Sequence, residues 1–357
     1  MIKVKVNKLK GHEILAKHIV SESGFELIST GTMLKKEYIE RLKELGIEEA
    51  YVMESEEPSK EDETFDIIKE EVREESKKVV KNVLEKHIYK NTADLTELCD
   101  VADNIINEIM SEEEVMEQTT NIRQSTTSDV YSHSINVCAL STVLALKAGM
   151  SRSIVSDIAK GSILHDIGLR YIVVPYENAD IIELPLKDQI EYKKHVVYGF
   201  DSIKNVDWLS DLSKNIVLLH HERNNGSGYP FKNHGSSISE PIKIVAVCDE
   251  FDSLIGGIGH KQFKMHEAVE YMRALSVNAL DGTYVDLLLQ MVAMYPVGTK
   301  VMTNEGEIGV VTRQNKGYID RPIIKIIKDK DGKEPTEELI KDMTKILTIF
   351  IVKVFED

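Results

Sequence analysis

Hydrophobic positions follow helical spacing through the middle of the chain and alternate with polar positions near its two ends. From about residue 119 to 294 the spacing is helical throughout, and Pro296 marks the point where it changes. The pattern predicts a mainly α protein. Its centre is an all-helical bundle over residues 119–294, with a smaller unit on each side.

The N-terminal part combines short β-like runs with one helical segment. The runs IKVKV, AKHIV, FELIST and EEAYVM favour strands. Leu34 to Leu45 has the spacing of an amphipathic helix, which Gly46 closes. These features predict a small α/β unit at residues 1–53. The acidic stretch ESEEPSKEDET, residues 54–64, is typical of a solvated linker.

A helical connector is expected between this unit and the bundle. Residues 65–118 are polar, with Val and Ile at helical spacing, and Asn91-Thr92 is expected to divide them into two helices. With the acidic linker they form a connector over residues 54–118. Such a helix pair could join domains or pair two copies of the chain. The heptad pattern is too loose to choose, so a homodimer stays open.

The C-terminal part returns to β-type patterning. The runs VGTKVMT, EIGVVTR, IIKIIK and ILTIFIVKVF favour strands, and NEGE and DKDG favour turns. They predict a β-rich extension over residues 295–357. Neither terminal unit carries a chemistry-bearing motif, so packing or partner contact is the expected role of both.

Charge and cysteine content narrow the setting. A net charge of −16 argues against binding polymeric nucleic acid, but a bound metal could still attract a small anion. Cys99, Cys138 and Cys248 show no CxxC spacing, which indicates buried free thiols in a reducing cytoplasm. No signal peptide is evident and no apolar stretch is long enough to span a bilayer. We therefore expect a cytoplasmic protein that does not insert into membranes.

Histidines and aspartates recur on apolar stripes of the predicted bundle. The set comprises His133, His165, Asp166, His195, His220, His221 and Asp249. Imidazole and carboxylate are ligand types for Fe, Mn and Zn, and more than four candidates indicate two or more ions. An isolated inward histidine is more often a hydrogen-bonded core residue. Seven buried ionisable groups, however, would each need a separate partner.

Helix geometry suggests how these ligands are shared. Adjacent residues on a helix point about 100° apart. We therefore expect Asp166 to bridge two metals rather than chelate beside His165. By the same argument, His220 and His221 should serve different metals. Each candidate is expected on the buried side of a helix.

The order of these residues resembles the HD-GYP family, a branch of the HD metal-dependent phosphohydrolases. HD at His165-Asp166 and the later element HHERNNGSGYP carry the resemblance, which covers about residues 120–294. It implies an all-α bundle with two or three divalent metal ions, usually iron or manganese. It also implies hydrolysis of a bacterial cyclic dinucleotide, above all cyclic di-GMP, to a linear dinucleotide, with GMP as a further product left open.

The resemblance also assigns residues. The family's metal ligands map onto the seven positions above. Asp129, four residues before His133 and so on the same predicted helix face, takes the place of an extra acidic ligand that is usually Glu. Tyr229 is expected near the substrate, with a turn-shaping role as the alternative. The GYP loop maps onto Gly226, Gly228, Tyr229 and Pro230.

Departures from the family pattern fall on the phosphate-binding side. Leu169 replaces the usual Lys, and Arg170 could take its place because the segment before Pro175 is two residues longer. Asn225 replaces the Asp of the GYP loop. The segment GGIGHKQ replaces an RPYR-like run, which leaves Lys261, helped by His260, to contact phosphate.

Together these features predict a cyclic dinucleotide phosphodiesterase. We expect Asp166, Arg170 and Lys261 to serve catalysis, through water activated by metals and stabilisation of phosphate charge. The expected substrate-binding residues are Gly228, Tyr229, Pro230, His260 and Lys261. One alternative is a degenerate cyclic-dinucleotide sensor or partner-binding module, suggested by Leu169 and the missing arginines. Another is an HD phosphohydrolase acting on a different nucleotide.

Overall fold

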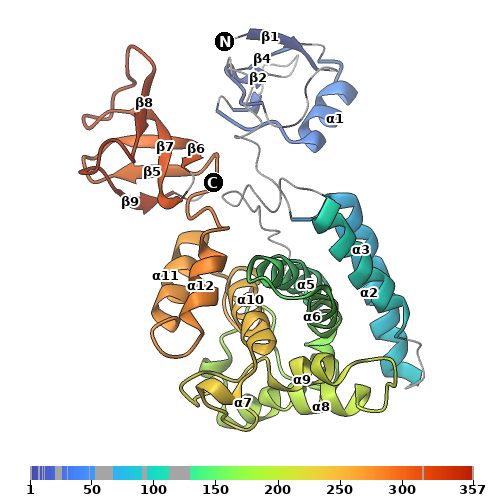
Figure 1. The fold of residues 1–357 in the computed structure, drawn as a ribbon. Helices are drawn as coiled ribbons and strands as arrows, with labels where there is room; N and C mark the ends of the chain where they lie inside the picture. Colours follow the sequence, from blue (N-terminus) through green and yellow to red (C-terminus); the bar gives the residue numbers. More distant parts are fainter. Residues whose placement is uncertain are drawn as a thin grey trace. The chain divides into compact units, whose positions relative to one another are not determined.

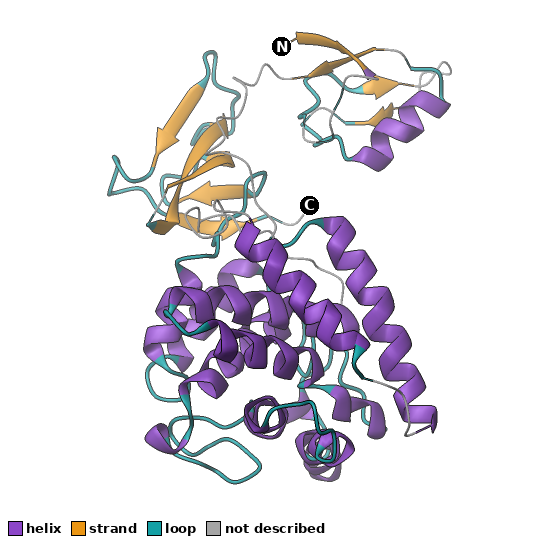
Figure 2. Cartoon of the chain, turned by 45° about the vertical axis from the view of Figure 1, so that its right-hand side comes forward, coloured by secondary structure: helices purple, strands orange, loops and turns teal. Residues whose placement is uncertain are grey.

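The computed structural model describes residues 2–6, 9, 11, 13–20, 26–29, 31–47, 49–52, 67–90, 95–111, 129–315 and 317–355. The chain forms two compact units, Met1–Glu63 and Thr64–Asp357. Helices fill its middle, and strands lie in the N-terminal unit and the C-terminal sheet (Figures 1 and 2). The predicted fold class is confirmed. The finer division into four parts stays a prediction.

The N-terminal unit is a small α/β structure, as its patterning predicts. Its described residues form two antiparallel strand pairs and one helix: β1 (Ile2–Lys5) with β4 (Glu49–Val52), β2 (Ile19–Val20) with β3 (Glu26–Ile28), and α1 (Lys36–Glu44). Its core includes the buried side chains of Leu15, Leu34 and Leu42. The run AKHIV provides only the two-residue strand β2.

The second unit is built around two buried helices, α5 (Val130–Lys147) and α10 (Glu240–Gly256), which pack against each other. Both are buried on nearly all sides, as in the centre of a helical bundle. The other helices of the bundle are α6 (Arg152–Leu164), α7 (Leu186–Lys193), α8 (His195–Ile203), α9 (Asp211–Leu219), α11 (Met265–Leu275) and α12 (Gly282–Leu289). Three short 3-10 helices complete it: η2 (Ile167–Tyr171), η3 (Ile181–Glu183) and η4 (Gly235–Ser237).

The described part of the connector, residues 67–90 and 95–111, forms α2 (Glu70–Lys90) and α3 (Glu97–Ser111). They pack on each other and on α5, and α3 also packs on α6. The apolar face of α3 is buried within the chain, including Val101, Ile105 and Ile109. Because this face is already covered, it offers no seam for a second copy, and a homodimer stays a prediction. Asn91 and Thr92, the expected helix breakers, lie outside the described residues.

The C-terminal part is a five-stranded antiparallel sheet in the order β8-β7-β6-β5-β9. Its strands are β5 (Lys300–Thr303), β6 (Ile308–Asn315), β7 (Tyr318–Lys328), β8 (Leu339–Asp342) and β9 (Ile351–Val354). Alternate residues such as Val301, Val311 and Ile324 point inward. Strand β8 was not predicted from the sequence, because this short strand does not alternate between buried and exposed positions.

The expectations about membrane spans and cysteines concern the described helices and three side chains. No described helix is long and apolar enough to cross a bilayer. Cys138 and Cys248 are free thiols, and burial raises the pKa of both to about 12. Those two cysteines therefore behave as core residues. Cys99 is only half-buried.

Candidate metal centre and active site

The seven histidines and aspartates come together in two groups inside the second unit. The first group is His133, His165, Asp166 and Asp249, and the second is Asp166, His195, His220 and His221. Within each group the potential ligand atoms lie within 4.8 Å of one another. Asp166 belongs to both groups, so one carboxylate lies between two sets of imidazoles.

Helix ends, rather than helix faces, carry most of these side chains. His165 follows the last residue of α6, His195 is the first residue of α8, and His220 follows the last residue of α9. Only His133 and Asp249 lie inside helices, α5 and α10. The expectation that every candidate sits on the side of a helix is therefore wrong, although all of the side chains except the 13% exposed His221 are buried.

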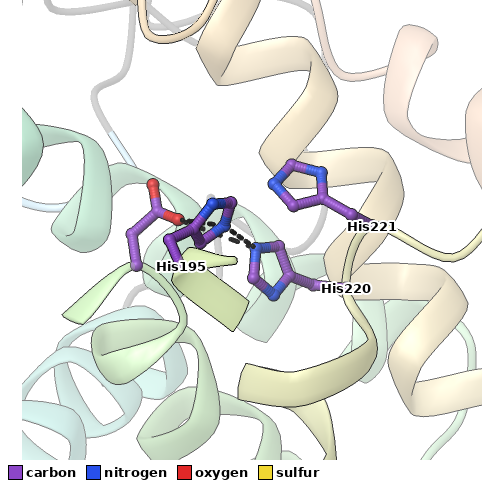
Figure 3. Close-up of side chains that lie close together, drawn as sticks. His195, His220 and His221 are labelled. Carbon is purple, nitrogen blue, oxygen red and sulfur yellow. Dashed lines mark hydrogen bonds and ion pairs between the residues drawn. The ribbon is translucent and has the colours of Figure 1, made fainter. Parts of the chain in front are cut away.

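The expected separation of adjacent ligands is also wrong. α6 stops at Leu164 and Asp166 has φ −102° and ψ 13°, so the 100° helical offset does not apply and His165 and Asp166 enter the same group. His220 and His221 likewise lie past the end of α9, with ring centroids 4.2 Å apart. Figure 3 shows their imidazoles together with that of His195.

Gly168 permits the close approach that completes the second group. A Cβ at this position would lie 1.8 Å from the backbone oxygen of His195, so only glycine fits between η2 and α8. The two elements pack directly on each other. As a result, Asp166 at the start of η2 comes within 3.3 Å of His195, measured from Oδ1 to Nε2.

Hydrogen bonds fix the tautomer of several of the imidazoles. Three of the rings donate from Nδ1 to backbone carbonyls: His165 to Ser162 at 2.6 Å, His195 to Tyr192 at 2.8 Å, and His220 to Val217 at 3.1 Å. A carbonyl can only accept, so Nδ1 carries the proton and Nε2 keeps its lone pair. This is how metal-binding histidines are oriented.

The Nε2 atoms face one another across each group. His133 Nε2 lies 3.1 Å from His165 Nε2, and His195 Nε2 lies 3.5 Å from His220 Nε2. Lone pairs at such distances repel unless a proton or a cation lies between them. The donor set therefore suits positive ions.

The two aspartates each face both groups. Asp166 Oδ2 lies 3.5 Å from His165 Nε2, whereas its Oδ1 faces His195. Asp249 Oδ1 lies 3.1 Å from His133 Nε2, and its Oδ2 lies 3.7 Å from His221 Nδ1. Asp166 Oδ1 and Asp249 Oδ2 are buried and accept no hydrogen bond from the described residues. Buried carboxylate oxygens without donors fit cation binding, because leaving them unpaired is costly.

The two groups differ in their electrostatics. Burial disfavours charge on His133, yet its hydrogen bonds to Asp249 and Asp252 raise its pKa to about 10. Burial lowers the pKa of His195 to about 4, despite the nearby Asp166 carboxylate. Without a metal, a proton therefore occupies the first group near neutral pH, whereas His195 stays neutral with its Nε2 lone pair free.

Asp129 is the predicted ligand that the structure does not bring to the site. It caps α5 with extended backbone, φ −145° and ψ 150°, and accepts from the backbone N–H of Ser132 at 3.0 Å. Lys77 on α2 holds its carboxylate at 2.6 Å. Asp129 belongs to neither metal group. Because an N-cap residue lies outside the helix, the shared-face argument that paired it with His133 does not hold.

The GYP loop lies against the second group. The Tyr229 ring stacks on His221 with centroids 4.7 Å apart. A Cβ at Gly228 would lie 2.4 Å from the backbone oxygen of His221, so this glycine lets the loop approach, and Pro230 follows through a cis peptide bond. The loop therefore has a turn-shaping role and also places a phenol beside the candidate ligands.

The predicted phosphate-binding side chains lie farther out. The Lys261 side chain is 58% exposed, and its Nζ pairs with Glu183 at 2.7 Å and Asp180 at 3.3 Å. His260 Nε2 lies 3.5 Å from Glu250. The Arg170 guanidinium lies 5.6 Å from the centroid of the Tyr131 ring. In the described part of the chain, no hydrogen bond or ion pair joins Lys261, His260 or Arg170 to either metal group.

Two residues with clear positioning roles were not singled out from the sequence. Asp252 binds His133 Nδ1 at 2.7 Å and so orients that ring. It lies one turn after Asp249 on a buried helix, a spacing that could have identified it. Glu222 is buried and accepts the backbone N–H groups of Phe231 at 2.7 Å and Asn233 at 2.8 Å, which ties down the GYP loop. Its place directly after His221 in HHERNNGSGYP is the signal that could have identified it.

Curated relatives share the central part of the chain. The chain is 29% identical over 224 residues to cyclic di-GMP phosphodiesterase PA4108 of Pseudomonas aeruginosa, covering 61% of this chain and 53% of that protein. It is 30% identical to a cyclic di-GMP phosphodiesterase of Thermotoga maritima, covering 50% and 49%. It is 31% identical to 3'3'-cGAMP-specific phosphodiesterase 2 of Vibrio cholerae, covering 41% and 28%. The chain thus spans about half the length of the first two.

A solved structure and two family models agree with the fold. Bd1817, an HDG"Y"P protein from Bdellovibrio bacteriovorus, matches 80% of this chain and 97% of its own at a TM-score of 0.53 and 20% identity, which shows the fold alone. A KOW domain associated with HD domain matches residues 300–357. The HD domain model matches residues 104–284, just over half of the chain. The chain therefore belongs to the HD domain family, and the HD-GYP resemblance of its sequence is confirmed.

Proposed function

We propose that this protein is a metal-dependent phosphodiesterase that hydrolyses a cyclic dinucleotide to a linear one, with cyclic di-GMP as the first candidate substrate. One observation carries the proposal: two ligand groups share Asp166, and two buried carboxylate oxygens face them without hydrogen-bond donors. The names of the relatives, which are cyclic di-GMP and cGAMP phosphodiesterases, support the same reaction class.

Two divalent ions, iron or manganese, are the proposed cofactors. Mixed imidazole and carboxylate donors suit these metals. The first ion would be held by His133, His165, Asp166 and Asp249, and the second by Asp166, His195, His220 and His221. Bound there, the ions would activate a water for attack on phosphorus and neutralise charge on the phosphate. A third ion at Asp129 is not proposed, because Lys77 pairs with this carboxylate.

The chain's own residues prepare this chemistry by fixing the donors. Asp252 and the helix-end carbonyls hold the imidazoles in one orientation, so little reorganisation is needed during the reaction. Asp166 is the proposed bridging carboxylate, because its two oxygens face different groups. Complete burial of His165, His195 and His220 keeps competing water away from the donors.

On the substrate side, Tyr229 is proposed to contact the dinucleotide, with Gly228 and Pro230 placing its ring. Arg170 is proposed to bind a phosphate oxygen, because its buried Nε has no hydrogen-bond partner among the described residues. Catalytic and binding roles for Lys261 and His260 stay predictions, because both side chains now face carboxylates. We also propose a cytoplasmic setting, in line with the free thiols.

The direct test compares Asp166→Ala with wild-type protein in a cyclic di-GMP hydrolysis assay with manganese or ferrous iron. Asp207→Ala is a matched control, because Asp207 is exposed and lies in neither ligand group. We expect turnover by the wild type and the control, and none detectable in Asp166→Ala. Equal turnover in all three proteins, or none in the wild type, would contradict the proposal.

A second candidate function is a sensor that binds a cyclic dinucleotide without cutting it. Its support is that Leu169 is a buried core residue, where the family has a phosphate-contacting lysine, and that Lys261 is already ion-paired. Calorimetry of cyclic di-GMP with metal-loaded protein separates the two functions. A stable binding heat without product favours the sensor, whereas product formation favours the enzyme.

A further inference from the structure

Lys193 places a cation at the border of the second metal group. It is the last residue of α7, two residues before His195. Its Nζ lies 5.6 Å from the centroid of the Tyr229 ring, and that ring stacks on His221 with centroids 4.7 Å apart. The ammonium and a candidate metal ligand thus contact the same aromatic ring.

Lys193 differs from Lys194 and Lys261 in having no carboxylate partner among the described residues. Its neighbour Lys194 pairs with Glu191 at 2.8 Å, and Lys261 pairs with Glu183 at 2.7 Å. An aromatic face attracts an ammonium without using its N–H groups as hydrogen bonds. Lys193 is therefore held in place while its three donors stay available to an anion.

The proposed substrate class requires such a cation. A cyclic dinucleotide carries two phosphodiester groups, and only one of them can be cut at the metal pair at a time. The other brings a full negative charge to a chain whose net charge is −16. A lysine acts as a point charge for a phosphate and tolerates varied geometry.

Arg170 and Lys193 lie over different tyrosine rings, and only the ring under Lys193 contacts candidate metal ligands directly. Arg170 is four residues after Asp166 and lies over Tyr131, on the helix that carries His133. Lys193 lies over Tyr229, which contacts His221 and His195. The two side chains are therefore suited to different phosphates of one substrate.

We propose that Lys193, held on the face of Tyr229, binds the phosphate that is not being cut and so favours substrates with two phosphodiester groups. This inference rests on the proposed function. It assigns to Lys193 the phosphate contact that was predicted for Lys261 from its place in GGIGHKQ.

The test compares Lys193→Ala with Lys194→Ala, an adjacent lysine whose charge is taken by Glu191. For cyclic di-GMP, Lys193→Ala should raise KM by about 10- to 100-fold, the usual effect of losing a charged hydrogen bond, with kcat within about threefold. Lys194→Ala should leave both constants unchanged. Lys193→Arg, which keeps the charge, should recover most of the affinity.

Two further readouts exclude a general structural effect. Hydrolysis of bis(p-nitrophenyl) phosphate, which has a single phosphodiester, should be the same in Lys193→Ala and wild type. Equilibrium dialysis of cyclic di-GMP against metal-stripped protein should show weaker binding by Lys193→Ala. Equal affinity of Lys193→Ala and Lys194→Ala for cyclic di-GMP, or equal losses with both substrates, would overturn the inference. If the wild type does not cut cyclic di-GMP, the proposed function fails, but the dialysis comparison still decides the role of Lys193.

Discussion

The metal-binding side and the substrate-binding side of the site are built in opposite ways. On the metal side, the ligands are buried and most of their rings are fixed by hydrogen bonds to backbone or carboxylate. On the substrate side, Lys193 and Lys261 are exposed, and Lys193 and Arg170 lie over tyrosine rings. Under the proposed function, the fold would fix the metal geometry, whereas surface side chains would select the substrate.

Removing a shared carboxylate should have the largest effect. Asp249→Ala removes both carboxylate oxygens: Oδ1, which faces His133 in the first group, and Oδ2, which faces His221 and accepts no hydrogen bond from the described residues. We expect cyclic di-GMP turnover to fall by about a thousandfold or more, because the metals supply most of the charge stabilisation. Steady-state assays at saturating manganese measure this, with Asp207→Ala as control. A loss below tenfold would show that Asp249 is not a ligand.

Removing the carboxylate that orients His133 should have an intermediate effect. Asp252→Asn keeps the shape but loses the charge that binds His133 Nδ1 at 2.7 Å. Such outer carboxylates typically change metal affinity by about 10- to 100-fold. Competition with a calibrated chelator measures this change in affinity. Unchanged affinity would mean that His133 is oriented by the packing of α5 alone.

Loosening the GYP loop should affect stability as well as activity. Glu222→Ala removes the acceptor for the backbone N–H groups of Phe231 and Asn233. Leaving those donors unpaired should cost about 1–3 kcal/mol of unfolding free energy and lower Tm by a few degrees. Thermal unfolding measures this against Glu334→Ala, an exposed control. An unchanged Tm would argue that water replaces the carboxylate without loss.

Removing Lys261 should have the smallest effect. Its ammonium already pairs with Glu183 and Asp180, and its side chain is 58% exposed. We expect Lys261→Ala to change kcat/KM for cyclic di-GMP by less than about threefold, since exposed ion pairs contribute little. If Lys261→Ala lowered kcat/KM for cyclic di-GMP more than Lys193→Ala does, Lys261 rather than Lys193 would be the phosphate-binding lysine.

The sequence predicts the metal-binding side of the site better than the substrate-binding side. The seven candidate ligand positions were accessible from the sequence because they match a motif of fixed order. Asp129 was placed wrongly, because spacing of four residues does not reveal that a residue is an N-cap. The pairing of His220 with His221 was missed, because the sequence does not show that α9 ends at Leu219.

Substrate-side residues carry no comparable signal. Lys193 is one of several lysines in the segment KDQIEYKKH, and only the folded position of Tyr229 distinguishes it from Lys194. Glu222 is buried because the GYP loop folds back over it, and the local hydrophobic pattern does not predict this fold. Hydrophobic periodicity indicates which face of a helix or strand is buried, but it does not indicate which distant residues that face contacts.

Metal content is the measurement that tests the central claim most directly. Elemental analysis of anaerobically purified protein, reconstituted with iron or manganese, gives the number of ions per chain. The shared position of Asp166 predicts two ions per chain in the wild type and a loss of ions from both groups in Asp166→Ala. Wild-type protein that retains no more metal than Asp166→Ala would contradict the account.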